Sequence, residues 1–125
     1  MANILIVDDQ ANVRTAVMQL LLSCNRSDLT IDQATNGSDA LRRLQAKKYD
    51  LLISDTEVPG MNGADLMHAV RADEKLKQLP AILMLAVGAG KQDVLDAVAL
   101  GISGFIIKPF RPEQLRAQIK KVMGW

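Results

Sequence analysis

Three aspartates and one lysine are the residues of this chain whose types and positions could do chemistry together. Each stands just after a short apolar run: Asp8, Asp9, Asp55 and Lys108. Carboxylates that lie close together raise one another's pKa unless a cation offsets their charge. A few oxygen ligands open to water suit Mg²⁺, whereas zinc would prefer His or Cys. With a lysine beside them as a compact positive charge, these groups indicate phosphoryl transfer to an aspartate, in which positioning and charge neutralisation supply most of the catalysis.

Simpler roles are open to each of these residues taken singly. Asp8 and Asp9 could cap the first helix, where acidic side chains satisfy free N–H groups and the helix dipole. Lys108 could be a solvated lysine near a turn, and Asp55 could be a turn-forming residue. Their coincidence favours a shared site, because each group falls at the carboxyl end of a different predicted strand.

The elements that must position these side chains appear as two alternating kinds of segment. Four apolar runs predict buried strands, and a more polar segment near residues 29–35 predicts an edge strand. The buried runs are Ile4 to Val7, Leu51 to Ile53, Ala81 to Val87 and Gly104 to Ile107. Alternation of strands and helices demands a parallel sheet with helices on both faces, which is a doubly wound α/β domain. Ligands of such folds bind outside the carboxyl ends of the strands, where the candidate residues are.

Five helical patterns follow the five strands. In each pattern, apolar residues recur every three to four positions and predict a stripe buried against the sheet. The stripes are Val13, Val17, Leu20 and Leu21; Ala40, Leu41 and Leu44; Leu66, Met67 and Val70; Val94, Leu95 and Val98; and Leu115, Ile119, Val122 and Met123. No linker or repeat interrupts the alternation, so we expect one domain over residues 1–125, with no room for an output domain.

Composition excludes several classes of function. The 125 residues are 49% hydrophobic and 23% charged, and no apolar run is long enough to span a bilayer. The net charge is +1 and the basic residues are spread along the chain, so neither a membrane role nor direct nucleic-acid binding is expected. The first residues lack the features of a signal peptide, and the single cysteine, Cys24, cannot form an internal disulfide. These features predict a cytoplasmic protein.

The candidate residues stand in stretches that resemble the receiver domain of bacterial response regulators, the single-domain CheY-like type. The resemblance runs from Ile4 to Met123. It rests on Ile-Leu-Ile-Val-Asp-Asp at residues 4–9, Leu-Leu-Ile-Ser-Asp at 51–55 with Val-Pro-Gly-Met-Asn-Gly at 58–63, and Ile-Lys-Pro-Phe at 107–110. It implies a flavodoxin-like fold, with a doubly wound five-stranded parallel sheet of order 2-1-3-4-5 and five helices.

The resemblance also implies a role for each candidate residue. Asp55 would be phosphorylated by a histidine kinase, a phosphotransfer protein or a small phosphodonor. Mg²⁺ would be held by Asp9, Asp55 and the main-chain carbonyl of Glu57, and through water by Asp8. Lys108 would contact the phosphoryl group. On this pattern the protein is not an enzyme, apart from catalysing its own phosphoryl transfer and autodephosphorylation.

Signalling in this family implies a switch and a partner. The Lys108–Pro109 peptide bond is expected to be cis. Phe105 matches the aromatic switch position of the family, whose side chain moves between exposed and buried rotamers. The downstream protein partner is expected to bind the face formed by the fourth helix, the fifth strand and the fifth helix.

Two positions depart from the family pattern. Receivers normally carry Thr or Ser after the fourth strand, but the matching residue is Ala86, and no Ser or Thr occurs between residues 81 and 102. Because a hydrogen bond to a charged group contributes about 1.5–3 kcal/mol, its loss should weaken the coupling of Asp55 to Phe105 or leave that coupling to main-chain N–H groups. Glu57 adds a carboxylate two residues after the acceptor, and we expect its side chain to point outward.

Four further side chains have structural interpretations. Asn62 is expected to cap the third helix. His68 lies off the apolar stripe of its helix and is expected on the surface, whereas Cys24 is expected to continue the buried stripe of the first helix. Trp125 could pack against a helix or mark a contact surface, and the sequence does not choose between these.

Three other functions stand as alternatives. A pseudo-receiver would bind partners whatever the state of Asp55, although the intact acidic residues and lysine oppose that reading. A phosphohydrolase of the haloacid dehalogenase type also uses an aspartyl-phosphate, and residues 55–58 loosely resemble its nucleophile loop, but the chain is short for such an enzyme. A flavodoxin-like flavin binder would need a phosphate-cradling loop where Asp8 and Asp9 stand.

Overall fold

Strands and helices alternate along the chain in the computed structural model, which describes residues 2–24 and 26–125. The strands are β1 (Ala2–Val7), β2 (Leu29–Ala34), β3 (Leu51–Asp55), β4 (Ala81–Leu85) and β5 (Gly104–Ile107). The helices are α1 (Ala11–Leu22), α2 (Gly37–Ala46), α3 (Gly63–Ala72), α4 (Lys91–Ala99) and α5 (Pro112–Met123). Over these residues, none of the helices has both the length and the apolar character that crossing a bilayer requires.

The strands form one parallel sheet in the order β2-β1-β3-β4-β5. The expected order and the α/β fold class are confirmed, and β2 lies at an edge, as its more polar sequence predicted. Strand β4 ends two residues earlier than predicted, because the chain turns there with a hydrogen bond from Ala89 N–H to the carbonyl of Ala86. In the central strands, Val7 lies opposite Ser54 and Asp55 lies opposite Met84, so their carboxyl ends meet along one edge.

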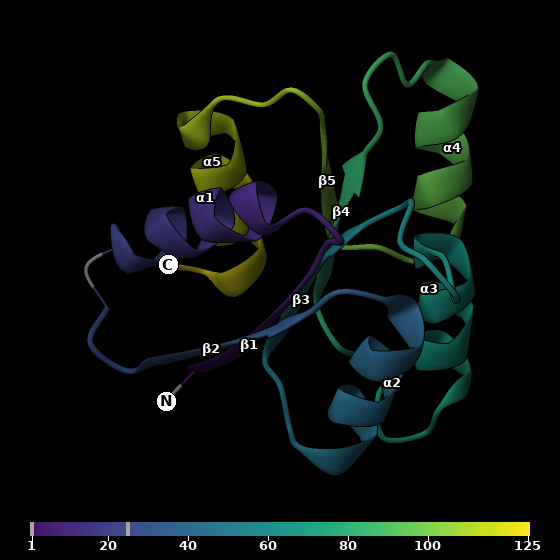
Figure 1. The fold of residues 1–125 in the computed structure, drawn as a ribbon, viewed down its shortest axis with the longest axis horizontal. Coiled ribbons are helices and arrows are strands. Elements are labelled where there is room, and N and C mark those ends of the chain that lie inside the picture. Colours follow the sequence, from purple (N-terminus) through teal and green to yellow (C-terminus); the bar gives the residue numbers. More distant parts are fainter. Residues whose placement is uncertain (1, 25) are drawn as a thin grey trace.

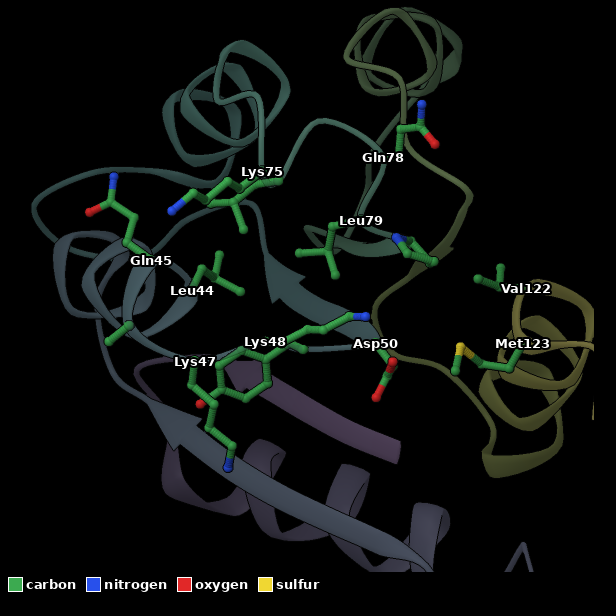
Figure 2. A pocket seen from close by; sticks show the side chains of 14 residues that line it. Leu44, Gln45, Lys47, Lys48, Asp50, Lys75, Gln78, Leu79, Val122 and Met123 are labelled. Atoms are coloured by element: carbon green, nitrogen blue, oxygen red, sulfur yellow. The ribbon is translucent and has the colours of Figure 1, made fainter. Parts of the chain in front are cut away.

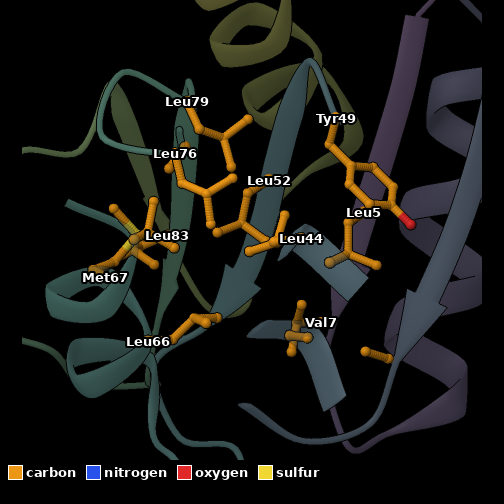
Figure 3. Close-up of a cluster of buried hydrophobic side chains, with 14 of the residues drawn as sticks. Leu5, Val7, Leu44, Tyr49, Leu52, Leu66, Met67, Leu76, Leu79 and Leu83 are labelled. Atoms are coloured by element: carbon orange, nitrogen blue, oxygen red, sulfur yellow. The ribbon is translucent and has the colours of Figure 1, made fainter. Parts of the chain in front are cut away.

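Helices cover both faces of the sheet. Figure 1 shows α1 and α5 on one face and α2, α3 and α4 on the other. Each face has its own core cluster, because alternate side chains of the central strands point to opposite sides. On the side of α2 and α3, Figure 3 shows strand residues Leu5, Leu52 and Leu83 packed with Leu44 and Leu66 of the helices. This rigid sheet fixes where the residues after each strand can lie.

Helix α4 departs from the predicted stripe. Val94 is half-buried and Ala97 is buried, whereas Leu95 and Val98 are 51% and 53% exposed. The pairs 94/97 and 95/98 have the same spacing, and each would give a stripe along one side of a helix. Packing on the sheet selects the first pair, and the prediction that Leu95 and Val98 are buried is wrong. The stripes predicted for the other four helices are buried or half-buried against the sheet.

Cys24 is a second correction. Helix α1 ends at Leu22, so Cys24 lies beyond the helix and does not continue its buried stripe. The side chain is half-buried, and its Sγ is 3.6 Å from the carbonyl oxygen of Leu20. The expectation of a core cysteine is therefore wrong, because the helix ends before its spacing could carry Cys24 into the core.

The remaining structural interpretations agree with the fold. His68 is exposed. The side chain of Asn62 caps α3 by accepting a hydrogen bond from the main-chain N–H of Asp65 at 2.8 Å. Trp125 packs, half-buried, against the core between the sheet and the α1–α5 layer, and the Arg26 guanidinium lies 4.4 Å from the centre of its ring. Of the two alternatives for Trp125, the structure shows packing.

Candidate functional site

Three carboxylates meet beside the carboxyl ends of β1 and β3. Asp55 is the last residue of β3, and Asp8 and Asp9 directly follow β1. Because these strands are neighbours in the sheet, one carboxylate oxygen of each of the three side chains lies within 4.8 Å of the other two. Asp8 is fully buried and Asp55 is only 6% exposed, whereas Asp9 is exposed to solvent.

Lys108 brings a positive charge to this acidic cluster from β5. It directly follows the strand, and its main-chain N–H donates to the carbonyl of Leu85 at the end of β4. Its ammonium donates to Oδ2 of Asp8 at 2.9 Å and to Oδ2 of Asp55 at 3.2 Å. The peptide bond from Lys108 to Pro109 is cis, as expected. The four polar side chains expected at the strand ends therefore converge in one place.

Burial and charge act in opposite directions on Asp55 and Lys108. Burial raises the pKa of Asp55, the Lys108 ammonium offsets only part of this rise, and the nearby Asp8 carboxylate adds to it. Burial would lower the pKa of Lys108, but its hydrogen bonds with Asp8 and Asp55 and the attraction of their negative charges together outweigh burial and raise that pKa. One ammonium facing three carboxylates leaves two negative charges uncompensated. A divalent cation matches that deficit.

The donor set fits a hard cation such as Mg²⁺. All three side chains offer oxygen, and the exposed Asp9 leaves one side of the cluster open to the water ligands that Mg²⁺ retains. Glu57 has an exposed side chain, as expected. Its main-chain N–H is 3.4 Å from Oδ1 of Asp55, which keeps the segment after β3 next to the cluster.

The structure contradicts the alternative in which Asp8 and Asp9 cap the first helix. The residue at the cap position of α1 is Gln10, and no side chain caps the helix there. Asp8 instead accepts the main-chain N–H of Gln10 at 2.9 Å, and Arg14 donates to the carbonyl of Asp8 at 2.8 Å. Arg14 thus holds the main chain of Asp8 while its carboxylate stays with the cluster. The sequence does not single out Arg14, because an arginine on a helix is most often solvated.

Gly63 allows α3 to begin directly against the end of β3. A Cβ atom at this position would lie 2.6 Å from the carbonyl oxygen of Asp55 and 2.7 Å from Cα of Thr56, closer than real side chains approach. The N–H of Gly63 donates to the carbonyl of Thr56 at 2.9 Å. Any larger residue at Gly63 would push the helix away from the main chain that carries Asp55.

The two expected switch positions lie on β5 and after β4. Ala86 follows β4, is half-buried, and offers only a methyl group. Phe105 lies opposite Leu83 in the sheet and packs, half-buried, against the core on the α2–α3–α4 side. A hollow of about 310 Å³ beside the loop after β4 is lined in part by Thr56, Ala86 and Leu100. Among the described residues no hydrogen bond joins Ala86 to Asp55.

Comparison with known proteins decides the family. Residues 4–120 match the model of the response regulator receiver domain. The chain belongs to that family. This receiver domain is 38% identical to the chemotaxis protein CheY of Pseudomonas aeruginosa over 119 residues, which cover 95% of this chain and 94% of that protein.

Solved receiver structures share its fold. The chemotaxis response regulator CheY4 of Vibrio cholerae matches this receiver domain with a TM-score of 0.86 at 30% identity, covering 98% of both chains. The receiver domain of a sensor histidine kinase from Pseudomonas aeruginosa has a TM-score of 0.85 at 22% identity and covers 99% of this chain and 98% of that one. That neighbour was solved with a magnesium ion coordinated in its active site cleft.

Family membership confirms the expected class of function. The chain is a CheY-type receiver domain, a phosphoacceptor class of two-component signalling, and this family is a signalling domain rather than a conventional enzyme. The match over residues 4–120 opposes the haloacid dehalogenase and flavin-binding alternatives. The pseudo-receiver alternative stays open, because it lies within the same family.

Proposed function

We propose that Asp55 is the phosphoacceptor of this receiver domain, with a phosphohistidine of a histidine kinase or phosphotransfer protein as the donor. One observation carries the proposal. The nearly buried Asp55 carboxylate lies 3.2 Å from the Lys108 ammonium and shares a cluster of oxygens with Asp8 and Asp9. In residues 2–24 and 26–125 this is the only group of three side chains placed to hold a metal ion.

The proposed reaction is an in-line displacement at phosphorus. A carboxylate oxygen of Asp55 forms a bond to phosphorus while the bond from phosphorus to the donor imidazole breaks, and the departing ring nitrogen takes a proton from solvent. Lys108 keeps its ammonium beside the acceptor and offsets negative charge on the phosphoryl oxygens. Water later attacks the aspartyl-phosphate, which releases inorganic phosphate and restores the carboxylate. Both steps are catalysed by the receiver itself.

Mg²⁺ is the proposed cofactor. Asp9, Asp55 and the main-chain carbonyl of Glu57 would hold it, and Asp8 would reach it through water. Both oxygens of Asp8 already accept hydrogen bonds, from Gln10 and from Lys108, which supports an indirect contact. When bound, Mg²⁺ would neutralise part of the charge of the carboxylates and of the incoming phosphoryl group.

The proposed readout is contact with a protein partner through α4, β5 and α5. Leu95 and Val98 support this face, because apolar side chains more than half exposed on one side of α4 are available for contact. Ala86 cannot donate a hydrogen bond to the phosphoryl group. Typical allosteric couplings are about 1–3 kcal/mol, and one charged hydrogen bond is worth about 1.5–3 kcal/mol. Phosphorylation should therefore move Phe105 less than it would with a hydroxyl at position 86.

Ala86 also favours a second candidate function. A pseudo-receiver that binds its partner on the same face in every state of Asp55 would need no hydroxyl there. The two candidates differ in whether partner binding depends on phosphorylation of Asp55. We also propose a cytoplasmic location for either one, with which the lone thiol of Cys24 is compatible.

Incubation with Mg²⁺ and acetyl phosphate tests the acceptor. Intact mass spectrometry should show one added phosphoryl group that is acid-labile and absent from Asp55→Asn. If neither acetyl phosphate nor kinase-containing extracts produce the adduct, the pseudo-receiver is favoured. Sustained turnover of a phosphate ester would instead indicate an enzyme.

Ala86→Thr tests the readout. We expect the amide NMR shifts of Val98 and Phe105 to change more on phosphorylation in this variant than in the parent. Equal changes in both proteins would contradict the proposed loss of coupling. The adduct on Asp55 serves as the control, because the variant must be phosphorylated to the same extent as the parent.

A further inference from the structure

A hollow lies at the edge of the sheet opposite the acidic cluster. Its volume is about 650 Å³, and it lies between the end of α2 with the turn that follows, the segment from α3 to β4, and the end of α5 (Figure 2). Asp50 directly precedes β3 and Pro80 directly precedes β4, so the hollow lies where the strands begin. The five residues of β3 separate it from the carboxyl edge, a length of roughly 13 Å or more at about 3.3 Å per residue.

The floor of the hollow is apolar. Leu44, Leu76 and Leu79 are buried members of the core cluster on this face, and the half-buried Val122 and Met123 of α5 flank them. Figure 2 shows Leu44 and Leu79 directed into the hollow from different sides. Methionine adapts its shape readily to what packs against it. An apolar group seated here would extend the core outward and be removed from water.

Positive charge surrounds this apolar floor. The basic residues that line the hollow are Lys47, Lys48 and Lys75. Lys47 is paired with Asp32, with its Nζ 2.9 Å from the carboxylate. Lys48 and Lys75 form no ion pair with any of the described residues. Asp50 is the one acidic lining residue, and its carboxylate accepts a main-chain N–H at 2.8 Å. Three ammonium groups and one carboxylate therefore line the hollow, so positive charge is in excess there.

The helix dipole explains only part of this charge. A cation after the end of α2 complements the partial negative charge of the helix carbonyls, and Lys47 already stands there. Lys75 lies three residues beyond the end of α3, outside the last turn. Figure 2 shows the Lys48 side chain extended across the hollow and that of Lys75 at its rim. The two charged ends lie on different sides of the hollow, and each is carried by a flexible four-carbon stem that can turn toward a bound anion.

We propose that this hollow binds an amphipathic monocarboxylate, whose apolar chain covers the leucine floor and whose carboxylate lies by Lys48 and Lys75. Charge complementarity selects an anion, and the volume falls within the range of roughly 300–1,000 Å³ that is typical of small-molecule pockets. Lysine meets an anion as a point charge, and the apolar floor favours an anion that carries an apolar chain. The inference does not rest on phosphorylation of Asp55.

Octanoate is the probe that tests this proposal. The ¹⁵N-labelled full chain is titrated separately with three ligands. Octanoate is the probe, octanol tests the apolar chain without the charge, and acetate tests the carboxylate without the chain. We expect saturable amide shifts over residues 44–50, 75–80 and 122–123, with octanoate about tenfold tighter than either half, a difference of about 1.4 kcal/mol. Asp55→Asn should bind octanoate as the parent does, which separates this test from that of the acceptor.

Two double variants with the same change in charge sharpen the test. Lys48→Gln with Lys75→Gln should weaken octanoate about threefold to tenfold, as expected for two exposed charge contacts. Lys91→Gln with Arg111→Gln removes two exposed cations near the starts of α4 and α5, at the other edge, and should leave binding unchanged. Equal weakening by both pairs would overturn the proposal, as would octanol binding as tightly as octanoate. Absence of saturable shifts below the micelle concentration of octanoate would also overturn it.

Discussion

The Arg71 side chain joins the α3–β4 segment to the α4–β5 loop by hydrogen bonds to main-chain carbonyls, and its removal should destabilise the protein strongly for a residue so near the surface. From the end of α3, its guanidinium donates to the carbonyls of Gly101, Lys77 and Leu79 at distances of 2.8–3.2 Å. No carboxylate of the described residues pairs with it, and burial lowers its pKa. Arg71→Ala would leave three carbonyls without their donor.

The environment of each bond sets the size of the effect. Three of the four bonds, those to Gly101 and Lys77, are exposed, and the bond to Leu79 is partly buried. Exposed carbonyls regain water, so each of those bonds contributes about 0.5 kcal/mol, whereas the bond to Leu79 from a charged donor contributes about 1.5–3 kcal/mol. Arg71→Ala should therefore cost roughly 3–4.5 kcal/mol. Arg71→Lys should cost about half as much, because one ammonium cannot reach three carbonyls.

Urea denaturation followed by circular dichroism measures this loss. A loss of 1 kcal/mol in a domain of this size also lowers Tm by about 3–5 °C. Arg42→Ala on α2 is the matched control, because Arg42 is 78% exposed and, among the described residues, pairs only with Asp39 one turn away. That control should change stability by less than about 0.5 kcal/mol. Arg71→Ala costing no more than Arg42→Ala would refute the reasoning.

Three further predictions concern titrating groups. In metal-free protein near neutral pH, Asp55→Asn should be more stable than the parent, because burial raises the pKa of Asp55 and the folded state disfavours its ionised form. Stability tied to a raised carboxyl pKa is fully present below the unfolded-state pKa and is lost as pH rises through the folded-state pKa. Urea titrations should therefore show the two proteins converging in acid, and a gap independent of pH would contradict this. Calorimetry should show that Mg²⁺ binding is lost in Asp9→Asn and kept in Glu57→Gln. The reason is that the side chain of Glu57 is exposed and only its main-chain carbonyl is a proposed ligand. Loss of binding in both variants would count against that assignment. Tyr49, the single tyrosine, should ionise at a pKa of about 12 rather than 10.0 in an ultraviolet titration, because of burial and its 2.6 Å hydrogen bond to Asp32. Asp32→Asn should bring the midpoint down, and a midpoint near 10.0 in the parent would contradict the prediction.

The acidic cluster was predictable from the sequence because of one property of parallel sheets. Residues at the carboxyl ends of parallel strands must lie at the same edge, so Asp8 and Asp55 meet once β1 and β3 are neighbours. The order of the strands was not predictable from alternation, and it came only from the family resemblance. Taken alone, Asp8 was also consistent with a helix cap, and only its coincidence with Asp55 and Lys108 favoured the shared site. The structure contradicts the helix-cap alternative, because α1 begins at Ala11 and Gln10 is at the cap position.

The features that the sequence did not reveal lie where loops from several elements converge. Leu95 and Val98 repeat the spacing of the buried pair on α4, so periodicity could not tell the packed side from the exposed one. In the sequence, Arg71 and Lys48 each look like an ordinary solvated charged residue. The residues around them belong to loops, which show no hydrophobic periodicity. The neighbours of a residue at the end of a strand follow from its position in the chain. At the opposite edge of this sheet, the ends of helices lie next to one another only because of how the helices pack. The monocarboxylate hollow could therefore be recognised only once α2, the α3–β4 segment and α5 were placed together.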